Sequence, residues 1–199
     1  AFALALSSET THLVEALALR EGMQVADVGA GDGEWAERLA AEVGASGHVY
    51  ATEIDADDVA DIEERASRAG LENVTALLGT VTDTGLAAGC CDAILLRMVY
   101  HHFTDPAPMR ASLRRALRPG GRLAVIDLRP QDWGDVPRVP NRGGHGIREE
   151  DLVAEMTSDG FEVVARYEEW ADSQVRYCVV FRRADGPAVS EADGQQEER

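Results

Sequence analysis

Lysine is missing from this sequence. All 19 basic residues are arginine, and they face 36 acidic residues, which gives a formal net charge of −17. Such an acidic surface repels phosphate backbones, so we expect no nucleic-acid partner. Two causes fit this composition, a GC-biased genome that favours arginine codons or adaptation to high salt, and composition alone leaves both open.

Long apolar runs and cysteines are also scarce. No apolar stretch reaches the roughly 18 residues that span a bilayer, so we expect no membrane partner. The apolar opening AFALALSS is either the remnant of a trimmed signal peptide or the start of a helix in a shortened chain, and we favour the helix. The cysteines, Cys90, Cys91 and Cys178, form no disulfide framework, which predicts reduced thiols and a cytoplasmic protein.

The chain alternates between helical and strand patterns. Helices are expected over 7–19, 34–43, 57–69, 105–117 and 149–158, and strands over 23–28, 48–54, 74–78, 93–98, 123–127, 162–167 and 175–182. The strands are continuous apolar runs, which is typical of a parallel sheet covered on both faces in an α/β fold. We therefore predict an N-terminal helix over 1–22 that packs on a domain over 23–183, followed by a disordered acidic tail over 184–199.

A glycine-rich turn follows the first predicted strand. The segment VADVGAGDG, Val25–Gly33, has glycines at 29, 31 and 33, which allow positive φ angles and close approach of a ligand. A dinucleotide fingerprint would need a third glycine at position 34, where this chain has Glu34. Asp27, two residues before the first glycine, suits a ligand with a cationic amine better than a pyrophosphate.

A second acidic residue ends the next predicted strand. Glu53 lies in VYATEID, twenty residues after Gly33, where a carboxylate can accept both hydroxyls of a ribose. Together the two motifs indicate a ligand that contains adenosine and a group other than a pyrophosphate.

With LRPGGRLAVID at 117–127, these motifs resemble the class I S-adenosylmethionine-dependent methyltransferases, and in particular small-molecule, type 11-like members. The similarity is good over about 24–127 and looser elsewhere. It implies a Rossmann-like three-layer sandwich with a seven-stranded, mostly parallel sheet that contains one antiparallel strand.

The resemblance also implies a cofactor site for S-adenosylmethionine. The 29–33 loop would hold the methionine part and Glu53 the ribose. Many members bind adenine through an acid after the third strand; here the stretch is GTVTD, so backbone groups of Thr80 and Val81, or Asp83, would take that part. The expected cofactor-binding residues are Asp27, Gly29, Ala30, Gly31, Gly33, Glu53, Ile54, Thr80, Val81 and Arg97.

The reaction site is expected beside RMVYHHF, which follows the fourth predicted strand. Tyr100, His101 and His145 are the catalytic candidates, with a histidine as general base if the acceptor starts protonated. His102 fits a packing residue. His145 is either part of a lid formed by the loop over 129–146 or a cap of the following helix.

The roles of Asp127 and Arg129, and the possibility of a metal site, follow from their places along the chain. Asp127 and Arg129 either line the pocket or form a buried ion pair. Because a strand separates Cys90 and Cys91 from His101 and His102, one ion cannot bind both pairs, so we predict no metal site.

We therefore predict a methyltransferase with a small-molecule acceptor, acting as a monomer or homodimer. A cofactor-binding protein without catalysis is one alternative. A nicotinamide-dependent oxidoreductase is another, although a chain without lysine has no Tyr-x-x-x-Lys pair.

Overall fold

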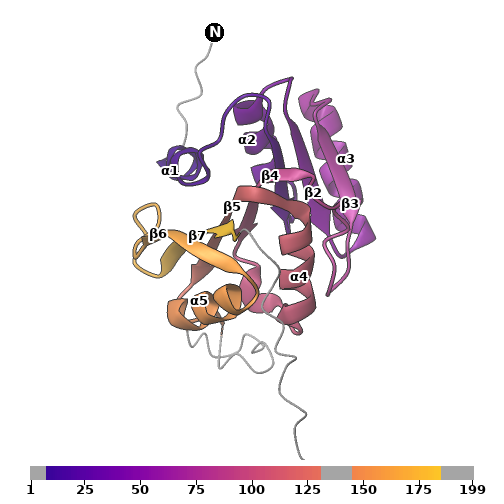
Figure 1. The fold of residues 1–199 in the computed structure, drawn as a ribbon. Helices are drawn as coiled ribbons and strands as arrows, with labels where there is room; N and C mark the ends of the chain where they lie inside the picture. The colour runs from indigo at the N-terminus through magenta and orange to yellow at the C-terminus, as the bar shows by residue number, and fades with distance from the viewer. Residues whose placement is uncertain (1–7, 131–144, 185–199) are drawn as a thin grey trace, which may run out of the picture.

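A seven-stranded sheet forms the centre of the computed structural model, which describes residues 8–130 and 145–184 (Figure 1). The strand order is β3-β2-β1-β4-β5-β7-β6. The strands are β1 (Gln24–Val28), β2 (His48–Glu53), β3 (Val74–Leu78), β4 (Cys91–Arg97), β5 (Leu117–Leu128), β6 (Phe161–Tyr167) and β7 (Arg176–Arg183). Strand β7 runs antiparallel to both β5 and β6, and the other pairs are parallel. The predicted mostly parallel sheet with one antiparallel strand is confirmed.

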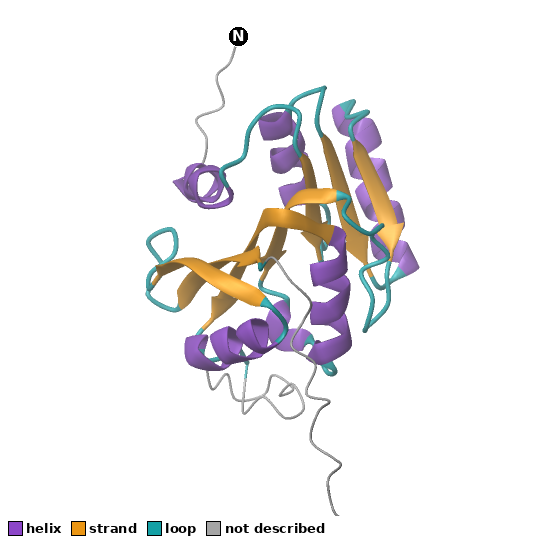
Figure 2. Cartoon of the chain, viewed as in Figure 1, coloured by secondary structure: helices purple, strands orange, loops and turns teal. Residues whose placement is uncertain are grey.

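Helices cover both faces of this sheet (Figure 2). They are α1 (Ser8–Leu17), α2 (Glu34–Val43), α3 (Ala56–Ala69), α4 (Pro106–Ala116) and α5 (Glu149–Ser158). Side chains of α1, α2 and α3 belong to one apolar core cluster and those of α4 and α5 to another. The predicted three-layer sandwich is therefore confirmed.

Alternating side chains of each central strand supply the two cores. In β4, Ile94 and Leu96 pack on the α4 side, whereas Ala93 and Leu95 pack on the α2 side. Because both faces are covered, all four positions are apolar and fully buried. This is the physical reason for the continuous apolar runs in the sequence.

Strand β5 is longer than the sequence pattern predicts. The pattern predicts a strand over 123–127, but β5 begins at Leu117 and includes Pro119-Gly120-Gly121. Pairing with β4 jumps from Cys91↔Leu117 to Ala93↔Arg122, so these residues form a bulge. Gly120 has a φ of 73°, a left-handed conformation that glycine adopts without strain.

Helix α1 packs on the sheet through apolar side chains and carries a carboxylate, Glu9, that binds three further groups. Glu9 accepts hydrogen bonds from the Arg97 guanidinium at 3.1 and 3.2 Å, from Arg176 at 3.0 and 3.2 Å, and from Trp170 Nε1 at 3.0 Å. Although burial raises the pKa of Glu9, the two arginines outweigh it and lower the pKa.

The domain boundaries at 22 and 183 stay predictions, and the acidic tail from residue 185 onward lies outside the described residues. Among the described helices, none has the length and apolar character needed to cross a membrane.

Candidate active site

A cavity of about 270 Å³ opens at the carboxyl ends of the parallel strands. The strand order reverses between β1 and β4, and such switch points are where open α/β sheets bind ligands. Its lining consists of Val28, Gly29, Thr52, Glu53, Ile54, Gly79, Thr80, Val81, Asp83, Thr84, Val99, His102, Phe103, Thr104 and Met109. Five predicted cofactor-binding residues line this one cavity, namely Gly29, Glu53, Ile54, Thr80 and Val81.

The glycine turn after β1 adopts the conformation that its sequence requires. Gly29, Gly31 and Gly33 have φ angles of 73°, 56° and 80°. A Cβ atom on Gly29 would lie 2.5 Å from Cγ2 of Val99, in the turn after β4. At Gly31 no described atom lies within 4 Å of such a Cβ, so the space in front of the loop is open. The loop therefore packs against the neighbouring turn at one glycine and faces open space at another.

Asp27 is a buried carboxylate with an unsatisfied oxygen. The residue is 2% exposed, and its Oδ2 has no hydrogen-bond partner within the described ranges. Burial, followed by repulsion from Glu53, raises the pKa of Asp27 to about 7, although Arg97 and a backbone hydrogen bond from Ala36 act in the opposite direction. A cationic group placed beside Oδ2 would relieve this penalty, which fits the predicted amine.

Glu53 is oriented by two backbone amides. Its Oε1 accepts a hydrogen bond from the amide of Gly31 at 2.8 Å, and its Oε2 accepts one from Ile54 at 3.0 Å. Each carboxylate oxygen keeps a further lone pair, and Glu53 is one of the residues that line the cavity. Both oxygens are therefore available to a pair of ribose hydroxyls without losing the contact to the glycine loop.

Apolar side chains and a tight turn form the far side of the cavity. Ile54 and Val81 are 57% and 56% exposed, which leaves apolar surface for a flat ring. The Thr80 amide donates to the carbonyl of Asp83 at 2.8 Å, so this amide is already used. Asp83 in turn binds Arg115 at 2.7 Å and the Gly85 amide at 2.8 Å, and these contacts hold its carboxylate at the cavity. Adenine binding through Val81 or Asp83 stays a prediction.

Arg97 lies outside the cavity lining. Its guanidinium is bound by Glu9 and stacks on the Trp35 ring with 5.0 Å between the guanidinium carbon and the ring centroid. A direct cofactor contact by Arg97 stays a prediction. The positive charge of Arg97 opposes the rise in the Asp27 pKa.

Tyr100 is not among the residues that line the cavity. Its ring is fully buried, and its hydroxyl donates to Glu155 at 2.7 Å and accepts from Arg110 at 3.3 Å. Burial raises the pKa of this phenol, which makes the tyrosinate form still less accessible. The geometry gives Tyr100 a role in attaching α5 to α4 and does not support the predicted catalytic role.

His101 forms a buried pair with Asp127. Its Nδ1 lies 2.6 Å from Oδ1 of Asp127, and its amide donates to Oδ2 at 3.1 Å. Both residues are at most 1% exposed. Asp127 thus pairs with a histidine, and the predicted alternative of an Asp127–Arg129 ion pair is wrong. Arg129 instead donates to the carbonyl of Glu168 at 2.6 Å.

The neighbouring His102 is exposed and lines the cavity, whereas the sequence favoured a packing role. It belongs to a short 3-10 turn, η1 (Tyr100–His102), that the sequence pattern did not predict. Burial of part of the ring and the nearby imidazoles of His101 and His145 lower the pKa of His102. His102 is therefore neutral at physiological pH and is the histidine nearest to the ligand space.

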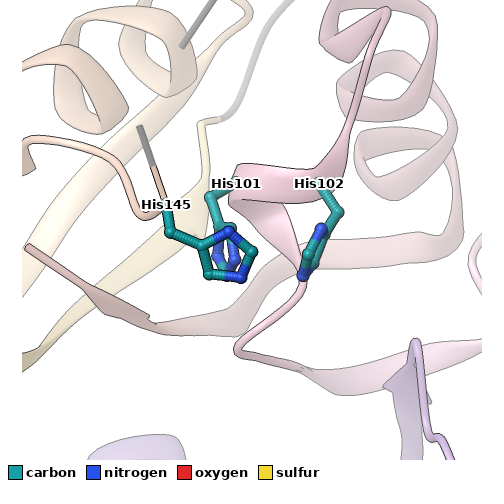
Figure 3. A group of neighbouring side chains, drawn as sticks. All are labelled: His101, His102 and His145. Atoms are coloured by element: carbon teal, nitrogen blue, oxygen red, sulfur yellow. The ribbon is translucent and has the colours of Figure 1, made fainter. Parts of the chain in front are cut away.

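His145 joins these two histidines from a distant part of the chain (Figure 3). Its ring centroid lies 5.0 Å from that of His101 and 5.3 Å from that of His102. The N-cap of α5 is Arg148, so the alternative that His145 caps this helix is wrong. The predicted lid falls mainly on residues 131–144, which lie outside the described residues.

The fold and the cavity define a class of protein. The strand order of the parallel sheet reverses beside a glycine turn, where open α/β sheets bind ligands. The buried Asp27 has one oxygen without a partner, and Glu53 is oriented by the Gly31 amide. These features together suit an adenosine ligand with a cationic amine. A family model described as a methyltransferase domain matches residues 19–185, so the chain belongs to the methyltransferase domain family.

Relatives and a solved structure agree with this family. The arsenite methyltransferase of Aquipseudomonas alcaligenes is 34% identical over 118 residues, which cover 56% of this chain and 34% of that protein. A protein-L-isoaspartate O-methyltransferase of Methanothrix thermoacetophila is 34% identical over 113 residues, 57% of this chain and 51% of that protein. The chain thus spans about a third to a half of the length of these curated relatives.

The fold match is closer to full length. The crystal structure of a SAM dependent methyltransferase from Aquifex aeolicus superposes with a TM-score of 0.76 at 24% identity and covers 87% of this chain and 88% of that one. The prediction of a class I S-adenosylmethionine-dependent methyltransferase domain is confirmed, with S-adenosylmethionine as its cosubstrate.

Proposed function

We propose that this protein transfers the methyl group of S-adenosylmethionine to a small-molecule acceptor bound beside η1. The observation that carries the proposal is the unpaired Oδ2 of Asp27, a buried carboxylate oxygen next to a glycine turn. A buried carboxylate oxygen without a partner is costly, and the α-ammonium group of the methionine part would supply one.

Different residues around the cavity would bind the ribose, the adenine and the methionine chain of the cosubstrate. Glu53 would accept the ribose hydroxyls while it keeps its bonds to Gly31 and Ile54. Ile54 and Val81 would cover the faces of the adenine. Gly31 leaves open space for the methionine chain, whereas Gly29 lets the loop pack closely against Val99.

The sulfonium group of the cosubstrate supplies a methyl group that is already activated. The protein must hold a nucleophile in line, about 3 Å from that carbon, and exclude water; such positioning contributes on the order of 7–11 kcal/mol. Val99, His102 and Phe103 form the wall of the cavity where an acceptor would lie. The roles predicted for His101 and His145 as general bases remain predictions.

The acceptor that we propose is a small molecule. The two curated relatives are named for arsenite and for a protein isoaspartate, so their names leave the methylated atom open. The net charge of −17 favours a small molecule over a nucleic acid. A cytoplasmic protein that acts as a monomer or homodimer belongs to the same proposal.

Calorimetry with three ligands tests the cosubstrate. We expect S-adenosylmethionine and S-adenosylhomocysteine to bind at micromolar concentrations and to raise the melting temperature, and NAD to do neither. Binding of NAD without S-adenosylmethionine would favour the oxidoreductase alternative. A screen of acceptors with a radiolabelled methyl donor then tests catalysis; binding without turnover on any acceptor would favour a cofactor-binding protein without catalysis.

A further inference from the structure

Three imidazoles converge beside the cavity. One ligand nitrogen from each of His101, His102 and His145 can be chosen so that all lie within 4.8 Å of one another. Figure 3 shows His101 and His102 on the η1 turn and His145 reaching them from the segment that leads to α5. A sequence separation of more than forty residues makes this meeting a product of the tertiary fold.

One of these nitrogens is buried without a partner. Nε2 of His101 has no hydrogen-bond partner in the part of the chain that the structure describes, and the residue is 1% exposed. Its other nitrogen, Nδ1, lies 2.6 Å from Asp127, which fixes a proton on Nδ1 and leaves the lone pair on Nε2. An unused lone pair in a buried position indicates a missing electrophilic partner.

Asp127 gives His101 the arrangement of a metal ligand. Histidines that bind metals commonly donate their second ring N–H to a carboxylate, which fixes the ring and raises the basicity of the ligating nitrogen. Asp127 is itself fixed by the amides of His101, at 3.1 Å, and of Leu128, at 2.7 Å. The carboxylate–imidazole pair is therefore rigid before any ion arrives.

We propose that His101, His102 and His145 form a binding site for a divalent transition-metal ion, of which zinc fits best. Three imidazoles with a fourth position open are the ligand set of catalytic zinc sites. Strand β4 separates Cys90 and Cys91 from η1, so one ion cannot bind both the cysteines and the histidines. An ion bound by the three histidines alone does not have to span this strand.

The cluster needs a modest contraction to bind zinc. With Zn–N bonds of 2.0–2.1 Å, tetrahedral ligand nitrogens lie roughly 3.4 Å apart. The present limit of 4.8 Å therefore requires the nitrogens to approach one another by up to about 1.4 Å. His102 is exposed on a short turn, so a rotation of its side chain can supply much of this movement.

The location of the site suggests what the ion would do, and this part rests on the proposed methyl transfer. Because His102 also lines the cavity, the open position would face the acceptor. An acceptor with a thiol or hydroxyl would lose its proton to water on binding the ion. Its anion would then take the methyl group, and the sulfonium would become a thioether, so charge and atoms balance.

Zinc titration of the chelator-treated full chain tests the site without any cosubstrate. We expect one zinc per chain with a dissociation constant in the micromolar range or lower. His102→Ala and His145→Ala should each weaken binding at least tenfold, whereas His12→Asn, an exposed histidine on α1, should leave it unchanged. Equal affinity in all four proteins, or no binding to the parent chain, would overturn the proposal. Melting curves of each variant establish that the fold is intact.

Cobalt(II) spectroscopy and a carboxylate variant separate this site from other metal-binding groups. The cobalt form should show visible bands of nitrogen ligation without a thiolate charge-transfer band, and Cys90→Ser should not alter it. A thiolate band that Cys90→Ser removes would place the ion at the cysteines and overturn the proposal. Asp127→Asn should weaken zinc binding by about 10–100-fold, an effect that an adventitious pair of surface histidines would not show.

Cosubstrate binding distinguishes the two proposals. If zinc fails to bind but S-adenosylmethionine does, only the metal site is wrong. If zinc binds to the histidines and S-adenosylmethionine does not bind, only the proposed function is wrong.

Discussion

Single carboxylates dominate the candidate site at the residue scale, and Glu53 is the first to test. Glu53→Ala removes the acceptors for two ribose hydroxyls, each a charge-assisted hydrogen bond worth about 1.5–3 kcal/mol. It also releases the Gly31 amide, which Glu53 holds at 2.8 Å. We expect the affinity for S-adenosylmethionine, measured by calorimetry, to fall at least tenfold while the fold survives.

Asp55 offers a matched control for Glu53. It lies two residues away and caps α3 by accepting a hydrogen bond from the Asp57 amide at 2.8 Å. Asp55→Ala should lower stability by about 0.5–2 kcal/mol, as the loss of an N-cap does, with little change in affinity. If Asp55→Ala lowered the affinity and Glu53→Ala did not, the ribose acceptor would be Asp55.

Asp27 should make cosubstrate binding depend on pH. Because burial and Glu53 raise its pKa to about 7 in the ligand-free protein, the carboxylate form that binds an ammonium group becomes scarce below neutrality. We expect the affinity for S-adenosylhomocysteine to be about tenfold or more weaker at pH 5.5 than at pH 8. Calorimetry in two buffers of different ionisation enthalpy would measure the proton released on binding below pH 7.

Asp27→Asn checks both the affinity and the stability expected from this carboxyl. The variant should bind weakly at either pH and lose the dependence. Since the folded pKa lies above the ordinary value of 3.8, Asp27 destabilises the ligand-free fold increasingly as pH rises from about 4 to about 7. The variant should therefore melt at a higher temperature than the parent at pH 8. If the affinity of the parent chain did not depend on pH, Asp27 would not be the group that binds the ammonium of the cosubstrate.

At the scale of elements, the attachment of α1 depends on Glu9. Its removal would leave the Arg97 and Arg176 guanidinium groups and Trp170 Nε1 without their shared acceptor. We expect Glu9→Ala to lower the free energy of unfolding by about 2–4 kcal/mol in urea denaturation. Glu15→Ala, at an exposed position of the same helix, should change it by less than about 0.5 kcal/mol. Equal effects of the two variants would mean that apolar packing alone fixes α1.

The elements that sequence predicted well are those set by local patterns. The bounds of α2, β3 and α5 agree with the prediction, since apolar periodicity determines each of them. The bounds of β5 were wrong because Pro119-Gly120-Gly121 has the composition of a turn, yet pairing with β4 absorbs it as a bulge. Local composition does not reveal a long-range pairing that overrides it.

The same division applies to the site. Asp27 and Glu53 were identified because each lies near the carboxyl end of a predicted strand, and parallel strands bring their carboxyl ends to one edge. The pairing of His101 with Asp127 and the approach of His145 depend on how η1 packs on β5 and the segment before α5. No spacing in the sequence encodes these contacts.

At the scale of the whole molecule, charge should determine the response to salt. If the excess of acidic groups reflects a saline environment, screening of their mutual repulsion should stabilise the fold. We then expect the melting temperature to rise steeply between low and molar sodium chloride. An uncharged osmolyte at matched osmolality serves as the control, because it acts on burial without screening charge. A melting temperature that does not change with salt would leave codon bias as the explanation.

The hydrogen bonds from the Gly31 and Ile54 amides to Glu53 affect the release of the product as well as the binding of the donor. The side chain loses its rotational freedom when the chain folds, so binding avoids a penalty of about 0.5–1.5 kcal/mol. The demethylated product carries the same ribose and gains the same advantage. Preorganisation at this carboxylate therefore captures donor and product alike, and S-adenosylhomocysteine should act as a strong competitive inhibitor whose departure limits the catalytic cycle.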